Sequence, residues 1–207
     1  MNKILFWILI ILAILVVGVV GYSILIEKTM IVKKPAIYLY PEESSNINVQ
    51  LNINGKIIND IPEYNNGWNV FVTKEGLIDN KYDYLFYEAK LNKISFPEEG
   101  WIIEYNSLEG WFDEKIPILG LNEKEISQFK EYWLNSLPEA DYYEIKLLDK
   151  EFLKENMNLL ITPTPDTIIR LEFYFKPISK KISINEPIVI TPKRTGFTVV
   201  EWGGILG

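Results

Sequence analysis

The pattern of hydrophobic and polar positions divides the chain into two parts. Ile4 to Ile26 is a run of 23 residues without a charge, and everything after it mixes short apolar stretches with polar ones. A helix that crosses the roughly 30 Å hydrocarbon core of a bilayer needs about 20 apolar residues. A helix that is apolar on every face suits lipid better than a protein surface. The pattern therefore predicts an N-terminal transmembrane helix, with residues 1–29 as a membrane anchor.

Two alternatives concern the fate and the orientation of this segment. A cleaved signal peptide has a shorter apolar run, of about 7–15 residues, followed by small residues; Gly18 and Gly21 are instead flanked by valine and tyrosine. Lysines are more numerous after the run than before it, which favours a cytoplasmic C-terminal side. A short basic head, a long apolar run and a large domain is, however, the layout of an uncleaved export signal. We expect a retained anchor, with residues 30–207 forming an extracytoplasmic β-rich domain.

Beyond the anchor, most apolar stretches have the periodicity of β-strands. Residues 46–53 alternate strictly between amide side chains and aliphatic ones, as a half-buried strand does. Asn54-Gly55 follows, a strong hairpin signal, so residues 56–58 are expected to return alongside. Turn residues recur about every 8–12 residues, which is typical of antiparallel sandwiches. Further strands are expected over residues 36–40, 68–72, 82–87, 101–105, 142–148, 158–162, 167–175, 187–191 and 197–202.

One segment has helical periodicity instead. Asn122 and Glu125 have the spacing of a capping box, and Phe129 and Trp133 continue an apolar stripe that Pro138 ends. Because a helix that covers a sheet needs such a stripe, we expect these rings to pack in the core.

The predicted fold class is α+β: the transmembrane helix, then a mostly antiparallel, sandwich-like β domain with one prominent amphipathic helix. Residues 108–119 contain glycine and proline, so only a short helix or irregular turn is expected there. The helical region near residues 106–140 could mark a boundary within the domain.

Composition excludes several kinds of chemistry. The chain has no cysteine and no histidine, which rules out disulfides, thiolate metal sites and catalytic triads built on histidine. The net charge of −7 argues against nucleic acid as a partner. Residues 79–83 could offer oxygen ligands, but such stretches are ordinarily turns, so no metal site and no cofactor is predicted.

Two motifs carry a resemblance to known proteins. Residues 34–41 read Lys-Pro-Ala-Ile-Tyr-Leu-Tyr-Pro, and residues 199–204 read Val-Val-Glu-Trp-Gly-Gly. Together with shorter stretches between them, they resemble an uncharacterised family of membrane-anchored or exported bacterial and archaeal proteins. Tyr87 departs from that pattern, in which tryptophan is expected. The resemblance implies one continuous, outward-facing domain and brings no catalytic residues with it.

Without histidine or cysteine, catalysis would depend on carboxylates. Glu88 ends an aromatic strand and Glu201 lies in another; aromatic surroundings raise the pKa of a carboxyl group, and two such groups could cleave a glycosidic bond. Alternatively, each could pair with Arg170 or Arg194, the two arginines of the chain. Four indole rings could stack on a sugar ligand, those of Trp68, Trp101, Trp111 and Trp202.

These observations favour a membrane-anchored, non-catalytic binding or structural module at the cell envelope. Its expected partners are the lipid bilayer, through Ile4 to Ile26, and an envelope glycan or another membrane protein. The alternative is a carboxylate-dependent hydrolase that acts on envelope glycans. Glu88 and Glu201 in one open cleft would favour the hydrolase, whereas pairing with an arginine in a dry core would remove them from catalysis.

Overall fold

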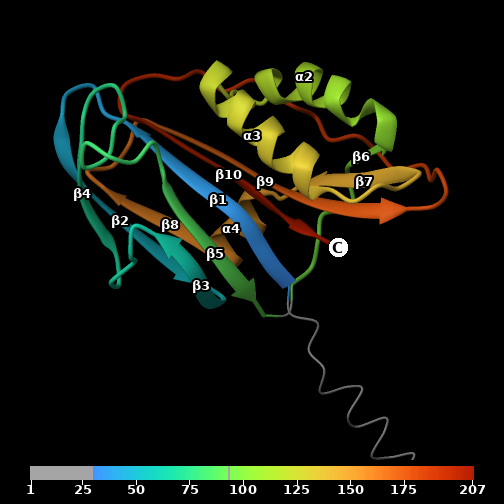
Figure 1. Ribbon diagram of the computed structural model, residues 1–207, viewed down its shortest axis with the longest axis horizontal. Coiled ribbons are helices and arrows are strands. Elements are labelled where there is room, and N and C mark those ends of the chain that lie inside the picture. Colours follow the sequence, from blue (N-terminus) through green and yellow to red (C-terminus); the bar gives the residue numbers. More distant parts are fainter. Residues whose placement is uncertain (1–29, 93) are drawn as a thin grey trace, which may run out of the picture.

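Two β-sheets and a layer of helices make up the part of the chain that the computed structural model describes, residues 30–92 and 94–207 (Figure 1). The larger sheet has the spatial order β3 (Gly55–Ile61), β5 (Leu85–Leu91), β1 (Met30–Tyr40), β10 (Thr198–Leu206), β9 (Thr167–Ile178), β7 (Tyr142–Leu147), β6 (Trp101–Glu104). The smaller sheet has the order β4 (Trp68–Val72), β2 (Ser45–Ile53), β8 (Met157–Thr162). The helices are α2 (Leu108–Ile118), α3 (Glu123–Ser136) and α4 (Lys150–Asn156), and a 3₁₀ turn at Tyr105–Ser107 precedes α2.

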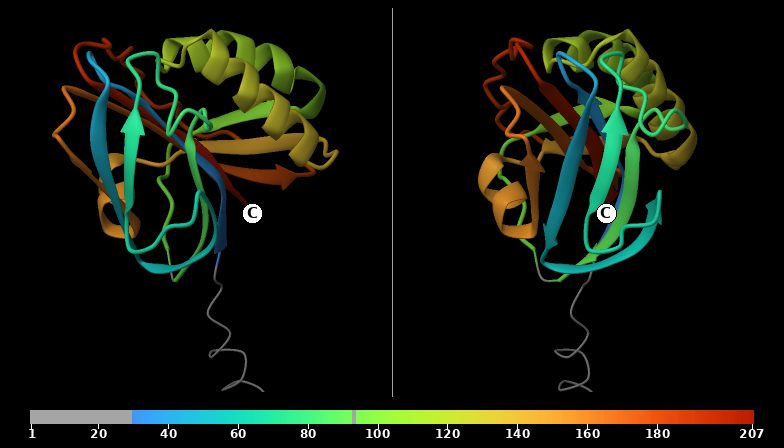
Figure 2. Two further views of the ribbon diagram at one scale, coloured as in Figure 1. Left: turned by 60° about the vertical axis from the view of Figure 1, so that its left-hand side comes forward. Right: turned by 90° about the vertical axis from the view of Figure 1, so that its left-hand side faces the viewer.

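The middle strands of the larger sheet are covered on both faces. The smaller sheet and α4 cover one face and form the inter-sheet core, while α2 and α3 cover the other and form the helix-sheet core (Figures 1 and 2). In β1, Ile37 and Leu39 belong to the inter-sheet core and Tyr38 to the helix-sheet core. Strand side chains alternate between faces, and β10, which is covered on both, buries every residue from Thr198 to Ile205.

The structure corrects the predicted fold class. Strands account for 44% of the described residues and helices for 20%, so the architecture is mostly β rather than α+β. The described residues hold three helices instead of one prominent helix, and β9 and β10 run parallel. None of the described helices is both long and apolar enough to cross a membrane. The predicted transmembrane helix at Ile4 to Ile26 lies outside the described residues.

The sequence of α2 explains why only a short helix is expected there. Gly110 and Pro117 both disfavour helix, but a side chain at Gly110 would meet nothing within 4 Å, and Pro117 lies in the last turn. Packing in the helix-sheet core outweighs the low intrinsic propensity. The buried residues of α2 are Leu108, Trp111, Phe112 and Ile116.

The prediction for α3 is confirmed. The side chain of Asn122 accepts a hydrogen bond from the backbone N–H of Glu125 (3.0 Å), and Glu125 accepts one from the backbone N–H of Asn122 (2.8 Å). Phe129 and Trp133 are fully buried in the helix-sheet core. Glu125 is also fully buried, which the capping role alone does not require.

Asn54 and Gly55 connect the two sheets rather than forming the predicted hairpin. β2 belongs to the smaller sheet and β3 to the larger one, where it pairs with β5. Gly55 has a φ of +150°, and a Cβ there would lie 2.0 Å from the carbonyl oxygen of Lys90. The backbone of Asn54 donates to the carbonyl of Asn156 and accepts from the N–H of Asn92, each at 3.0 Å. These contacts fix the point at which the chain changes sheet.

A long connection joins the parallel strands β9 and β10. Residues 187–191 within it, predicted as a strand, have no regular secondary structure. Arg194 fixes the connection to the start of α3, since its Nη2 donates to the carbonyl of Gly120 (2.8 Å) and to the carboxylate of Glu125. Tyr40 donates to the same carboxylate at 2.8 Å. The buried charge of Glu125 thus holds three segments together.

Glu125→Gln is expected to lower the free energy of unfolding by about 3 kcal/mol, because it leaves the guanidinium of Arg194 without its buried counter-charge. Glutamine can still complete the capping box, so the loss reports the ion pair. Urea unfolding of the full chain in mild detergent measures it. Lys74→Met, which removes an exposed contact of 3.9 Å with Glu75, should cost less than about 1 kcal/mol. Equal losses in the two variants would contradict the assignment.

Candidate functional site

Glu201 forms a buried ion pair in the inter-sheet core. Its carboxylate is fully buried, accepts a hydrogen bond from Arg170 Nε (2.5 Å) and accepts another from the Tyr87 hydroxyl (2.9 Å). Nη2 of Arg170 donates to the backbone carbonyl of Met157 on β8 (2.6 Å). All the strong polar contacts of this carboxylate therefore go to protein groups that hold the sheets together.

Glu88 lies on the opposite face of the same sheet. Ile37 of β1 pairs with Glu201 of β10 and with Leu85 of β5, so these three residues face the smaller sheet. Glu88 is three residues after Leu85 and faces the other way. The structure therefore does not bring the two predicted carboxylates together: Glu201 is paired with Arg170, and Arg194 is paired with Glu125.

The four tryptophans considered as sugar-stacking residues are core residues. Trp68 is 2% exposed in the inter-sheet core, and its indole N–H donates to the carbonyl of Pro62 (2.7 Å). Trp101, Trp111 and Trp202 lie in the helix-sheet core, at most 8% exposed. Their rings contact other aromatic side chains, so none of the four presents a face to solvent.

Sequence reasoning also overlooked the buried carboxyl group of Glu172 on β9. It is fully buried, and neither oxygen has a hydrogen-bond partner among the residues that the structure describes. Burial, and then the charge of Glu201, raise the pKa of Glu172 well above its ordinary range. The alternation of apolar and polar residues in β9 does not reveal this burial. Arg170 and Glu172 have the pattern of a solvent-facing row, although both faces of the strand are covered.

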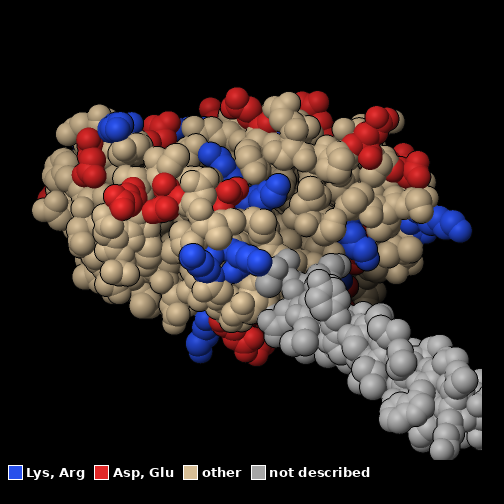
Figure 3. All heavy atoms as spheres, turned by 60° about the horizontal axis from the view of Figure 1, so that its bottom comes forward, with Lys and Arg blue, Asp and Glu red and all other residues tan. Residues whose placement is uncertain are grey.

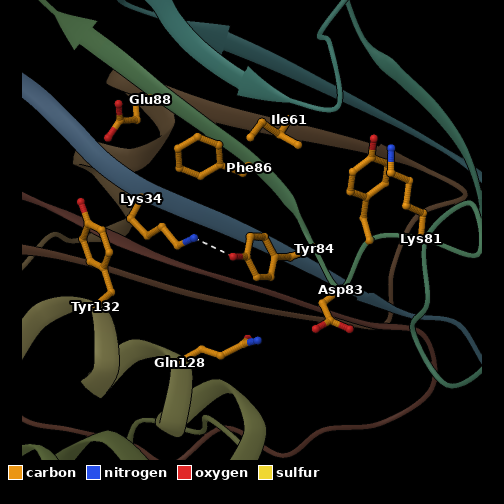
Figure 4. A pocket seen from close by; sticks show the side chains of 10 residues that line it. Lys34, Ile61, Lys81, Asp83, Tyr84, Phe86, Glu88, Gln128 and Tyr132 are labelled. Carbon is orange, nitrogen blue, oxygen red and sulfur yellow. Dashed lines mark hydrogen bonds between the residues drawn. The ribbon is translucent and has the colours of Figure 1, made fainter.

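A groove opens on the helix side of the larger sheet, where α3 meets β1 and β5. It consists of two adjoining hollows of about 530 and 360 Å³, which share Lys34, Tyr84, Gln128 and Tyr132. The first continues over Ile61, Phe86 and Glu88, and the second continues along α3 to Asn135 and Ser136. We call this site the Lys34 groove; Figure 4 shows the lining of its first hollow.

A β-bulge places Lys34 at the centre of the groove. Between Lys33 and Ala36, β1 has one residue more than both of its neighbours, and Lys34 has the left-handed φ of +59°. Such a conformation is unfavourable for lysine and is found where surrounding structure enforces it, commonly at functional sites. Pro35 in the middle of a central strand is the sequence signal that could have indicated the bulge.

Aromatic rings surround the ammonium group of Lys34. Its Nζ lies 4.5, 5.0 and 5.9 Å from the ring centres of Tyr84, Phe86 and Tyr132, and it donates a hydrogen bond to the Tyr84 hydroxyl (2.6 Å). Contacts between a cation and the face of a ring are attractive. The rings therefore hold the ammonium in place and leave its charge available inside the groove.

Burial and neighbouring groups determine the protonation and the hydrogen bonds of the polar side chains at the groove. The hydroxyl of Tyr38 donates to Gln128 Oε1 (2.5 Å), which leaves the amide nitrogen of Gln128 free to donate elsewhere. Burial raises the pKa of Tyr38 above its ordinary value, and burial followed by the charge of Glu88 does the same for Tyr132. Both phenols stay neutral at physiological pH, so they act as hydrogen-bonding groups and not as bases.

The groove offers binding groups rather than a recognisable reaction centre. Within residues 30–92 and 94–207, no cluster of three or more acidic side chains has the geometry of a metal site. Asp79 accepts a hydrogen bond from the backbone N–H of Phe71 (2.9 Å), and Asp83 pairs with Lys124 (2.7 Å). Two ammonium groups, three carboxylates, two side-chain amides and several rings line the two hollows, which is the composition of a ligand site.

Comparison with known proteins finds a similarity over part of the chain. No protein-family model and no solved structure matches the sequence. The chain is similar to an uncharacterised protein in the bglA 3′ region of Butyrivibrio fibrisolvens, with 47% identity over 62 residues. The match covers 27% of this chain and 65% of that protein, so the chain spans slightly less than two thirds of its relative.

The raised pKa of Glu172 predicts an unusual dependence of stability on pH. The folded state binds a proton that the unfolded state releases near pH 4.3, so stability falls as pH rises above that value, by roughly 1.4 kcal/mol per pH unit at most, until the raised pKa is passed. Glu172→Gln should remove this slope and be more stable than the wild type at pH 7. Urea unfolding from pH 5 to pH 8 measures both effects, with the exposed Glu99→Gln as a control that follows the wild type. An unchanged slope in Glu172→Gln would disprove the account.

Proposed function

We propose that residues 30–207 act as a non-catalytic binding module whose ligand occupies the Lys34 groove. The observation that carries this proposal is the groove itself: an elongated, ring-lined hollow beside a lysine held in a strained conformation. Its volume lies in the range of small-molecule and short-peptide sites, about 300–1,000 Å³. The middle strands of the larger sheet are covered by packed side chains, and the groove is a place where a ligand could reach the sheet.

The arrangement of charges supports binding over hydrolysis. Glu88 is the acidic residue of the larger sheet that lines the groove, whereas Glu201 and Glu172 lie on the far side of that sheet. A glycosidase needs two carboxyl groups on either side of one bond. Of the other two carboxylates that line the groove, Asp83 is paired with Lys124, and Glu131 is exposed on α3 at the second hollow. On the face in Figure 3, basic side chains are interspersed with acidic ones, which suits a mixed polar ligand better than nucleic acid.

We further propose that the module works at the cell envelope and associates with a lipid bilayer through residues 4–26. The support for this location is the sequence alone, in the 23 uncharged residues of that segment. The full chain is expected to sediment with membranes, to resist extraction at alkaline pH and to be released by detergent. Recovery of the intact chain in the soluble fraction without detergent would contradict the proposal.

Tyr132→Ala tests the binding function. The full chain, immobilised in mild detergent, is expected to retain a subset of peptide and glycan fragments released from cell envelopes. Removing the Tyr132 ring should weaken their retention at least tenfold, because the ring lines both hollows of the groove. Tyr142→Ala is the matched control, since Tyr142 is a half-buried tyrosine on β7 outside the groove, and it should bind like the wild type.

Two results would overturn the binding function. The first is that no fragment is retained above background, and the second is that retention does not depend on Tyr132. Cleavage of the fragments during the assay, abolished by Glu88→Gln, would instead establish an enzyme.

A further inference from the structure

We infer that the Lys34 groove selects a zwitterionic ligand, a short peptide with one free carboxylate and one free ammonium group. Lys34 would hold the anionic group and Glu88 the cationic one. This inference rests on the proposed binding function and adds the chemical class of the ligand. It follows from two opposite charges that share one hollow without neutralising each other.

The first of these charges is the ammonium of Lys34. The side chain is half-buried, and in the described part of the chain it forms no ion pair with any carboxylate. Its polar contact is with the neutral hydroxyl of Tyr84 (2.6 Å), and three rings surround it. Cation–π contacts recover only part of the hydration that a half-buried ammonium loses. An anionic group in the groove would supply the missing counter-charge.

The second charge is the carboxylate of Glu88. It is half-buried on β5, lines the same hollow, and makes neither a hydrogen bond nor an ion pair with any residue that the structure places. Its neighbour across β3 is the uncharged Asn59. A carboxylate left without donors in a hollow is a site for a cationic group.

The fold keeps these two charges apart. Figure 4 shows the ammonium of Lys34 turned toward Tyr84 and away from Glu88, with the ring of Phe86 beside both side chains. The left-handed backbone of Lys34 and the β-bulge fix this direction before any ligand arrives. Of the other charged residues in the first hollow, Asp83 is paired with Lys124, and Lys81 is exposed and lies over the ring of Tyr82.

The space between the two charges suits the aliphatic part of a peptide. The ring of Phe86 lines it, and Ile61 of β3, half exposed, extends it. Apolar side chains between two fixed charges would pack against a short carbon chain. A ligand with a single charge would leave either Lys34 or Glu88 desolvated and unpaired, and that penalty gives the groove its selectivity.

The test uses three synthetic probes and the full chain in mild detergent. The probes are the tripeptide alanyl-alanyl-alanine, which has one free ammonium and one free carboxylate, its analogue with an acetylated amine, and its analogue with an amidated carboxylate. Isothermal titration is expected to show that the wild type binds the unmodified tripeptide at least tenfold more tightly than either analogue. This comparison changes only the ligand, so it does not depend on the folding of any variant.

Two charge-removing variants assign each end of the ligand. Lys34→Met should bind the tripeptide and the amidated analogue equally, because the partner of the carboxylate is gone. Glu88→Gln should bind the tripeptide and the acetylated analogue equally. The matched controls are Lys90→Met, on the same strand as Glu88 but outside the groove, and Glu99→Gln, an exposed carboxylate; both should keep the wild-type preferences.

The outcomes separate this inference from the proposed function. If all three probes bind equally and Tyr132→Ala weakens each of them, the groove binds ligands but the zwitterionic selectivity is disproved. If envelope fragments are retained through Tyr132 and the tripeptide is not bound, the inference also fails while the binding function stands. If neither fragments nor probes bind, both proposals fall.

Discussion

Because the middle of the larger sheet is covered on both faces, charged residues on its strands must be paired or neutralised inside a dry core. A charge that enters a dry core needs a counter-charge and enough hydrogen bonds to offset the lost hydration. The chain has two arginines, and each one pairs with a fully buried glutamate: Arg170 with Glu201 between the sheets, and Arg194 with Glu125 at the start of α3. Glu172 has no such partner in the described region, so its burial favours the protonated form.

The same two-sided burial decides which parts of the fold could be predicted from the sequence. Local signals were sufficient for α3, because its capping box and apolar stripe act within one helix, and for the strand of residues 46–53. They failed where the answer depends on distant partners. The row formed by Arg170 and Glu172 is polar, but it faces a second sheet whose position no local pattern reveals. The Asn54-Gly55 turn has the sequence of a hairpin and instead carries the chain from one sheet to the other.

The candidate site was overlooked for a related reason. Tryptophan and paired carboxylates are conspicuous in a sequence, but here the four tryptophans considered pack the cores and the two carboxylates face opposite sides of a sheet. The groove combines Lys34 from a bulge in β1, Tyr84 and Phe86 at the start of β5, and Tyr132 from α3. Only the pairing of β1 with β5, together with the docking of α3, brings these residues together. The arrangement of the site is therefore a property of the tertiary structure.

The position of β10 has a consequence for biosynthesis. It follows all the other described strands in the chain, yet it lies between β1 and β9 in the middle of the larger sheet. During translation, β1 and β9 each present an unpaired edge until β10 leaves the ribosome, and such edges are sites of aggregation. The pairing of β1 with β10 also joins residues far apart in sequence, and contacts of that kind slow folding. A chaperone would therefore encounter a polypeptide that stays open until its central strand has been synthesised.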